Sequence, residues 1–279
     1  MSGHEIDQHL KSLADISEIL TAMNNLSKIE IHRLSGFIDA QNQLKQNIQI
    51  VVNDFLQFNS QFIQRENGNP MVVLLLGSER GFCGNINETL LAHLQTKVEL
   101  KNQKILLIPV GYKLQNKLET DERVVEFIPG ASAVEEIQQV LFDIIATLQR
   151  VTETYGPIQL SVLHLDQKQH TPIISKVLPA FTYENVQPVQ YSHPPLSYLQ
   201  SNILFTKLLD EYVFTSINSI LYNALMIENQ QRNQHLNIAV NHLTDKINHL
   251  KQKRNEIRQE EITEEIEVIM LGSDILMEK

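Results

Sequence analysis

The feature that most constrains the fold is a long stretch near the C-terminal end that contains neither glycine nor proline. It runs from Ser197 to Leu271. Because these two residues most strongly disfavour a helix interior, one uninterrupted helix is permitted over the whole stretch. Alternating spacings of four and three connect Leu236, Val240, Leu243, Ile247, Leu250, Arg254 and Ile257. All but Arg254 are apolar, and this period is that of a coiled-coil seam, so the helix needs a partner.

The first part of the chain has the same period and supplies that partner. Alternating spacings of three and four select a mostly apolar set: Leu13, Ile16, Leu20, Met23, Ser27, Glu30, Leu34, Phe37, Gln41, Leu44, Ile48, Val51, Phe55, Phe58 and Phe62. Two such helices at opposite ends of one chain predict an antiparallel coiled coil. The alternative is that each helix packs on its own domain. The polar interruption at Ser27 and Glu30 fixes the register, faces something other than the partner helix, or marks a loosened coil.

Between the two helices, short apolar segments alternate with helical patterns. The predicted strands are 71–76, 104–110, 124–128 and 158–165, and the predicted helices are 88–100, 112–118 and 133–154. This alternation predicts a parallel sheet with Rossmann-like winding, closed by a further apolar segment at 173–178. We therefore expect an α/β fold in which a Rossmann-like domain (residues 70–195) is inserted into a long antiparallel coiled coil. Its helices are expected at residues 1–66 and 197–279.

The composition excludes several classes of protein. The net charge of −10 argues against a general nucleic-acid binder, because binding phosphates needs clustered cations. Cys83 is the single cysteine, which excludes an internal disulfide and suits a reducing cytoplasm. The N-terminal residues show no targeting pattern, and the longest apolar run, 71–76, is far shorter than the ~20 residues that span a bilayer. We expect a soluble chain that is able to dock on a membrane protein.

A glycine-rich loop, 77–87, follows the first predicted strand, where α/β proteins commonly bind nucleotide phosphates. Its sequence, GSERGFCGNIN, matches neither GxGxxG nor GxxxxGK[ST] and contains no lysine. We therefore expect a structural or contact loop, with no direct nucleotide binding and no cofactor. Cys83 has no histidine close in sequence, so a small, semi-buried residue is favoured over a nucleophile.

The C-terminal helix carries two polar patterns. His235, His242 and His249 recur at heptad spacing, about 10 Å apart, which is too far for one metal ion to bridge. They predict a solvated or partner-facing stripe and no metal site. Further on, a basic block at 251–258 is followed by an acidic block at 260–267. These blocks are either solvated or contact an oppositely patterned partner.

The chain resembles the γ subunits of F-type ATP synthases in four motifs that occur in that family's order. The motifs are Thr21–Met23, Gly77–Asn87, Thr171–Pro179 and Arg258–Ile266, and the resemblance covers essentially the whole chain. It implies a central-stalk rotor shaft that couples ion-driven rotation of the membrane c-ring to conformational change at the catalytic β subunits. It also implies a non-catalytic subunit of a proton- or sodium-transporting complex, peripheral on the cytoplasmic side of the bacterial inner membrane. The implied partners are the α, β and ε subunits and the c-ring, with no nucleic acid.

The resemblance also implies contact residues. Met23 and Cys83 match positions that meet an acidic lever of the β subunits. Arg258, Gln259 and Thr263 match residues that hydrogen-bond a β loop, and Tyr191 matches a position facing the c-ring. The family's first helix is usually lysine-rich, whereas residues 1–70 contain 5 Lys+Arg against 8 Asp+Glu, which weakens attraction to an acidic lever. Asn85 stands where glycine is common, so we interpret the chain as a divergent member, with a second, alternative bacterial ATPase operon as one hypothesis.

Two other functions compete with this interpretation. A coiled-coil scaffold or tether unrelated to ATP synthesis explains the heptads, but neither the inserted domain nor the order of the motifs. A nucleotide-dependent enzyme with Rossmann-like winding predicts saturable nucleotide binding by the isolated chain, whereas the rotor shaft predicts none.

Overall fold

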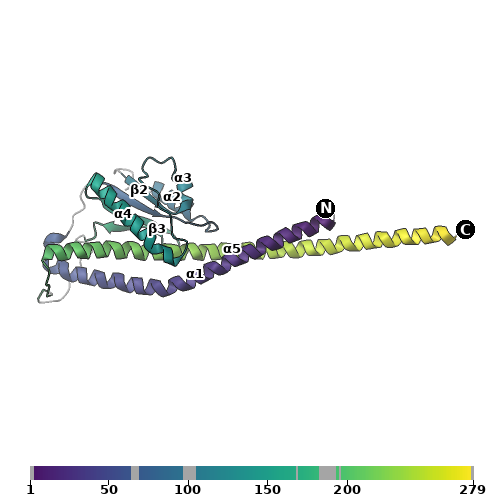
Figure 1. The fold of residues 1–279 in the computed structure, drawn as a ribbon, viewed down its shortest axis with the longest axis horizontal. Helices are drawn as coiled ribbons and strands as arrows, with labels where there is room; N and C mark the ends of the chain where they lie inside the picture. The colour runs from purple at the N-terminus through teal and green to yellow at the C-terminus, as the bar shows by residue number, and fades with distance from the viewer. Residues whose placement is uncertain are drawn as a thin grey trace. The chain divides into compact units, whose positions relative to one another are not determined.

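The computed structural model describes residues 3–63, 69–96, 105–167, 169–181, 193–194 and 196–277 (Figure 1). The chain forms two compact units, one of residues 1–27 with 233–279 and the other of residues 28–232. Two long helices, α1 (Gly3–Phe58) and α5 (Ser201–Met277), contribute to both units. Helix α1 ends at Phe58 and α5 begins at Ser201. The predicted division of the chain at residues 66, 70 and 195 stays a prediction.

In the unit of residues 1–27 and 233–279, α1 and α5 form an antiparallel pair. Arg254 Nη1 lies 3.5 Å from Asp7 Oδ1, while Asn24 is hydrogen-bonded to Asn233 and Asn237, so early residues of α1 meet late residues of α5. All the predicted seam residues of α5, from Leu236 to Ile257, are buried or half-buried. The seam prediction for this helix is confirmed.

The seam of α1 has the predicted period, but four of its predicted positions are wrong. Ile16, Phe37, Leu44 and Val51 are exposed, and the residue that follows each of them is buried or half-buried instead: Ser17, Ile38, Lys45 and Val52. Two of the replacing residues, Ser17 and Lys45, are polar, and no apolar period predicts them at a seam. Asn24 is likewise buried beside the half-buried Met23.

The polar interruption of the α1 seam has two separate explanations. Asn24 Nδ2 donates to Asn237 Oδ1 at 2.6 Å, and Asn233 Nδ2 donates to Asn24 Oδ1 at 2.6 Å. This asparagine network, with the buried Ser27 one turn away, is the kind of polar contact that fixes the register of a coiled coil. Glu30 faces something other than the partner helix, because its carboxylate accepts the backbone N–H of Val134 at 3.3 Å.

The unit of residues 28–232 contains a four-stranded sheet in the order β2-β1-β3-β4. Its strands are β1 (Met71–Leu76), β2 (Ile105–Val110), β3 (Gln159–Leu165) and β4 (Pro172–Leu178). Strand β1 lies parallel to β2 and β3, which confirms the Rossmann-like winding. The closing segment at 173–178 forms β4, which is antiparallel to β3 because the short connection between them permits only a hairpin.

The strand predicted at 124–128 is wrong: only isolated bridges pair Val124 with Leu107 and Ile128 with Val110. At the edge of β2 that faces this segment, the Leu107 N–H donates to Arg123 O at 2.8 Å. In a regular parallel strand pair, the backbone N–H of residue 109 would donate the next hydrogen bond to this segment. That residue is Pro109, which has no N–H, so the ladder is interrupted there and resumes only where the Ile128 N–H donates to Pro109 O at 3.0 Å.

Helices cover both faces of the sheet. On one face, Val72, Leu74 and Leu76 of β1 pack with α4 (Ile137–Tyr155) and with parts of α1 and α5. On the other face, Val73 and Leu75 pack with α2 (Ile86–Thr96) and α3 (Tyr112–Leu118). The short 3-10 helices are η1 (Ser60–Phe62) and η3 (Val134–Glu136). None of the helices in the described part of the chain is apolar over enough length to cross a membrane.

Candidate functional site

The glycine-rich loop leaves the carboxyl end of β1 and enters α2 at Ile86, where Asn87 closes it. The backbone N–H of Ser78 donates to Asn87 Oδ1 at 3.0 Å, and Asn87 Nδ2 donates to Ser78 Oγ at 2.9 Å. A Cβ atom on Gly77 would lie 2.5 Å from both Asn87 Oδ1 and Leu114 Cγ. The first glycine of the loop is therefore required for close packing.

The carboxylate of Glu79 ties the loop to its neighbours. Its Oε2 atom accepts the backbone N–H of Tyr112 at 2.8 Å and that of Gly130 at 2.7 Å. These two residues belong to the start of α3 and to the segment that follows the bridge at Ile128. One side chain of the loop thus fixes two connections at the same edge of the sheet.

A buried ion pair on α5, the Glu228–Arg232 clamp, holds the loop from the other side. Glu228 is 5% exposed and Arg232 is 2% exposed, and Arg232 Nη2 donates to Glu228 Oε1 at 2.6 Å. The Glu228 carboxylate accepts the backbone N–H groups of Glu79 at 3.2 Å and Arg80 at 3.1 Å.

Arg232 completes the clamp on the far side of the loop. Its Nε donates to Gly81 O at 3.2 Å, and its Nη2 lies 3.3 Å from Cys83 Sγ. A buried ion pair is tolerated when further hydrogen bonds satisfy both charges, as they do here. The clamp therefore fixes the backbone of residues 79–81 and the side chain of Cys83.

The electrostatics of the clamp keep Cys83 protonated. Burial, followed by the nearby Glu228 carboxylate, raises the pKa of the Cys83 thiol to about 12, although Arg232 acts in the opposite direction. Burial likewise raises the pKa of Glu228, and Arg232 and the two backbone N–H donors oppose that rise. A buried, protonated thiol is a poor nucleophile, which agrees with the expectation that Cys83 is no nucleophile, although the residue is more deeply buried than the semi-buried one expected.

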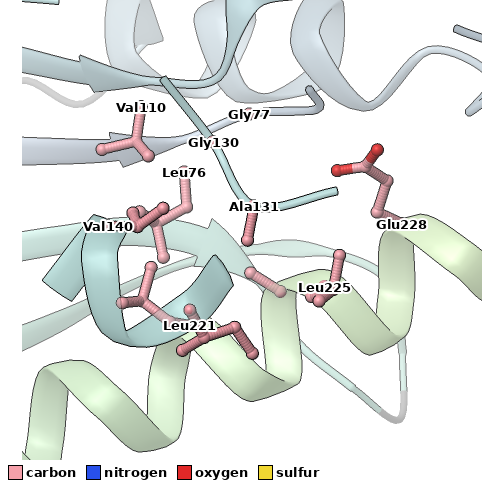
Figure 2. Close-up of a pocket in the computed structure, with 11 residues that line it drawn as sticks. Leu76, Gly77, Val110, Gly130, Ala131, Val140, Leu221, Leu225 and Glu228 are labelled. Atoms are coloured by element: carbon pink, nitrogen blue, oxygen red, sulfur yellow. The ribbon is translucent and has the colours of Figure 1, made fainter. Parts of the chain in front are cut away.

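The crevice where α/β proteins hold phosphates is nearly filled by side chains. The residues that line it include Leu221, Leu225 and Glu228 of α5, and Gly130 and Ala131 of the segment that follows Ile128 (Figure 2). The remaining cavity is about 30 Å³, room for about one water molecule, whereas small-molecule sites are typically about 300 Å³ or larger. The Glu79 and Arg80 N–H groups, which would face an anion there, donate to Glu228 instead. The arrangement is suited to holding the loop on α5 rather than to binding a ligand.

The contact residues implied by the resemblance lie in separate places. Met23 is half-buried on α1, and Cys83 is 4% exposed under the clamp. Arg258, Gln259 and Thr263 are exposed on α5, where Thr263 Oγ1 donates to the backbone oxygen of Gln259 at 2.8 Å. Tyr191 lies outside the described residues. Of this set, the structure brings together only Gln259 and Thr263, one turn apart.

Two important residues of this site, Glu228 and Arg232, were missed by the sequence analysis. The available signal was an acid and a base spaced four residues apart, directly after the apolar run 224–227 of α5. An acid and a base at this spacing ordinarily form an ion pair on the solvent-exposed surface of a helix. Its position behind an apolar run was the indication that it is buried.

Comparisons with known proteins agree with this architecture. A protein-family model for ATP synthase matches residues 2–276. The chain is 23% identical to the ATP synthase gamma chain of Fusobacterium nucleatum over 289 residues, covering 98% of each chain. It is 24% identical to the ATP synthase gamma chain of Saccharopolyspora erythraea over 300 residues, covering 98% of this chain and 96% of the relative.

Solved structures show the same fold. The chain is similar to a chain in the mitochondrial ATP synthase rotor of Euglena gracilis, with a TM-score of 0.63, 13% identity and coverage of 93% of this chain and 98% of that chain. A second Euglena gracilis structure, of the OSCP/F1/c-ring assembly, gives a TM-score of 0.65 at 13% identity, covering 99% of this chain and 94% of that chain. These structures show the shared fold, and the family model over residues 2–276 shows the family. The chain belongs to the ATP synthase gamma-chain family.

Proposed function

We propose that this chain is the central-stalk rotor shaft of an F-type ATP synthase. In this role it is a non-catalytic subunit whose rotation, driven by ion flow through the membrane c-ring, changes the conformation of the catalytic β subunits. Its partners are the α, β and ε subunits and the c-ring, and it lies peripherally on the cytoplasmic side of a bacterial inner membrane. Family membership supports this role, and one structural observation carries it.

That observation is the exposed last part of α5. The seam with α1 ends at Ile257, and from Arg258 to Met270 every side chain is exposed. Ile262, Ile266 and Ile269 recur on one face of this segment, and all three are exposed. An exposed apolar face of this length is typical of a surface that another protein covers. A surrounding ring of α and β subunits would cover it from all sides.

The proposed mechanism is mechanical coupling. The shaft contacts each of the three β subunits through a different surface. A contact changes the conformation of a β subunit only if it is stronger in one conformation of that subunit than in another. The exposed Arg258, Gln259 and Thr263 are proposed to contact a β loop, and Met23 and the Cys83 loop to contact the β lever. Because the Cys83 side chain is buried, its neighbours in the loop would make that contact. Tyr191 is proposed to face the c-ring.

Co-purification of a tagged chain from its native host tests this function. Recovery with α, β and ε subunits, and with an ATP-hydrolysing activity that the isolated chain lacks, is the expected result. Recovery of the chain alone or with unrelated proteins would overturn the rotor function and favour a coiled-coil scaffold.

A further inference from the structure

An apolar groove lies between α4 and α5, in the unit of residues 28–232. Its volume is about 780 Å³, whereas the crevice beside the glycine-rich loop holds about 30 Å³. Small-molecule sites typically have volumes of about 300–1,000 Å³. Apolar side chains from three elements line the groove: Ile145 and Leu148 of α4, Leu178 of β4, and Leu209, Val213 and Phe214 of α5. The groove therefore has the size and the lining of a site for a small organic molecule.

The floor of the groove is the edge of the hydrophobic core. Leu148 is a buried core residue, and Ile145, Leu178 and Val213 are half-buried residues that pack against the same core. Phe214, which also lines the groove, is 37% exposed. Because core side chains are close-packed, the groove is formed before any ligand binds, and binding would need little rearrangement. Covering its exposed apolar surface would be favourable.

The charged side chains that line the groove are both carboxylates, Glu153 on α4 and Asp210 on α5. Both are exposed, and neither has a hydrogen-bond or ion-pair partner in the described part of the chain. The cations nearest to them in sequence do not line the groove, since Arg150 pairs with Glu126 and Lys207 lies outside the lining. The groove thus combines apolar surface with negative charge that the described residues do not neutralise.

The end of α4 adds to this negative charge. Glu153 lies in the last turn of the helix, which ends at Tyr155 and contains no basic residue in that turn. The C-terminal end of a helix carries a partial negative charge, so a cation is favoured and a carboxylate is disfavoured there. A bound cation would therefore relieve the repulsion between Glu153 and the end of its own helix.

We propose that this groove is a binding site for a small cationic amphiphile, a molecule with an apolar body and a positively charged amine. The apolar body would cover the floor of the groove, and the amine would lie beside Glu153 and Asp210. A ligand without an apolar body would leave the floor uncovered, and an anionic amphiphile would be repelled by the two carboxylates. The site belongs to this chain alone and does not depend on the proposed rotor function.

Isothermal titration calorimetry of the full chain with decylammonium, below its micelle-forming concentration, tests the site. Decanoate is the paired probe, because it has an alkyl chain of similar length and the opposite charge. Saturable binding of one decylammonium per chain is expected, with an affinity at least about tenfold higher than that of decanoate. Equal affinities for the two probes, or binding that does not saturate, would overturn the proposal.

A groove-filling variant locates the probe. Thr152 lines the groove and is exposed, so Thr152→Trp should fill it and reduce the affinity for decylammonium by at least about tenfold. Thr154→Trp is the matched control. Thr154 is exposed on the same helix and, like Thr152, donates to the backbone oxygen four residues earlier at 2.8 Å, but it does not line the groove. This control should bind decylammonium as the native chain does, and equal affinities for the two variants would overturn the proposal.

A charge variant tests the carboxylates without changing the shape of the groove. Glu153→Gln with Asp210→Asn should bring the affinities for decylammonium and decanoate to within about threefold of each other. An unchanged preference for the cation would exclude these carboxylates and overturn the proposal. Thermal unfolding shows whether each variant is folded, and the charge variant keeps the test valid if Thr152→Trp is not.

A protein segment is the other possible occupant of the groove. In that case decylammonium would not bind the native chain, while Thr152→Trp, unlike Thr154→Trp, would prevent recovery with other subunits in the co-purification. That result would overturn the small-molecule site and leave the rotor function intact. Binding of decylammonium by a chain that co-purifies alone would support the site while overturning the rotor function.

Discussion

Arg232 Nη2 lies 2.6 Å from Glu228 Oε1, with both side chains buried one turn apart on α5. Between them they bond the backbone of residues 79–81, which lie about 150 positions earlier in the chain. This pair joins the glycine-rich loop to the long helix through hydrogen bonds. Its energetics can be measured directly.

Removing one partner of the clamp should destabilise the protein more than removing both. Arg232→Met leaves the Glu228 charge buried and unpaired, so we expect a loss of about 3–5 kcal/mol in the free energy of unfolding. The double variant Arg232→Met with Glu228→Gln removes both charges and should recover part of that loss. Urea unfolding of the two single variants and the double variant gives the coupling energy, and strictly additive losses would contradict a coupled pair.

Cys83 should be unreactive in the folded protein at neutral pH. Because the pKa of its thiol is about 12, alkylation by iodoacetamide should be slow at pH 8 and should speed up only as the pH approaches 12. Glu228→Gln removes a charge that raises this pKa, so alkylation should become faster. The unfolded chain is the control and should react at the rate of a free thiol. Rapid alkylation of the native fold would rule out the buried thiol.

The same pKa has a consequence for stability. The folded thiol keeps its proton up to about pH 12, while the unfolded thiol loses its proton in the usual range. The unfolded state therefore releases a proton that the folded state retains, and the free energy of unfolding falls as the pH rises through this interval. Cys83→Ser should show a shallower fall than the native chain in alkaline unfolding curves.

Asn24 should control the alignment of α1 and α5 more than their stability. Asn24→Leu removes both hydrogen bonds to Asn233 and Asn237 and adds apolar surface, so we expect alternative registers at little or no loss in Tm. The adjacent and exposed Asn25 provides a matched control, Asn25→Leu, which should keep one register. Spin-label distances between residues 11 and 249 should broaden for Asn24→Leu alone. A single narrow distance in both variants would exclude this role.

Two glycines should respond oppositely to the same substitution. At Gly77 a Cβ atom would lie 2.5 Å from Asn87 Oδ1 and Leu114 Cγ, so Gly77→Ala should cost about 1–3 kcal/mol. At Gly36, in the middle of α1, a Cβ atom would meet nothing within 4 Å. Gly36→Ala should therefore stabilise the protein by about 0.5–1 kcal/mol through helix propensity. Thermal unfolding of the two variants gives the comparison, and equal shifts would contradict it.

Arg258 and Gln259 should matter only in the assembled complex. Replacing both with Ala should reduce coupled ATP turnover by on the order of tenfold, because about 1.4 kcal/mol of contact energy corresponds to that factor. The isolated variant should remain folded, since both side chains are exposed. Lys251→Ala with Lys253→Ala, exposed on the same helix, is the control. Unchanged turnover in the first variant would remove these residues from the proposed contacts.

The long helices, their antiparallel pairing and the Rossmann-like winding followed from the sequence alone. Helix breakers and apolar period act within a few residues, so Leu236 to Ile257 identified the seam of α5 directly. On α1 the same reasoning missed Asn24, which occupies the seam through hydrogen bonds to Asn233 and Asn237, residues that no local pattern links to it. It also failed at 124–128, where the missing N–H of Pro109 on a neighbouring strand interrupts the ladder.

The site depended on the tertiary structure most of all. The sequence identified the glycine-rich loop and indicated that Cys83 is a small, semi-buried residue. It did not indicate that Glu228 and Arg232 hold that loop, because each hydrogen bond joins residues about 150 positions apart. Nor did it distinguish Cys83, which the fold buries, from Phe82, which the fold exposes. Local propensity determines which elements form, whereas the partner of a buried charge depends on which distant segments the chain topology brings together.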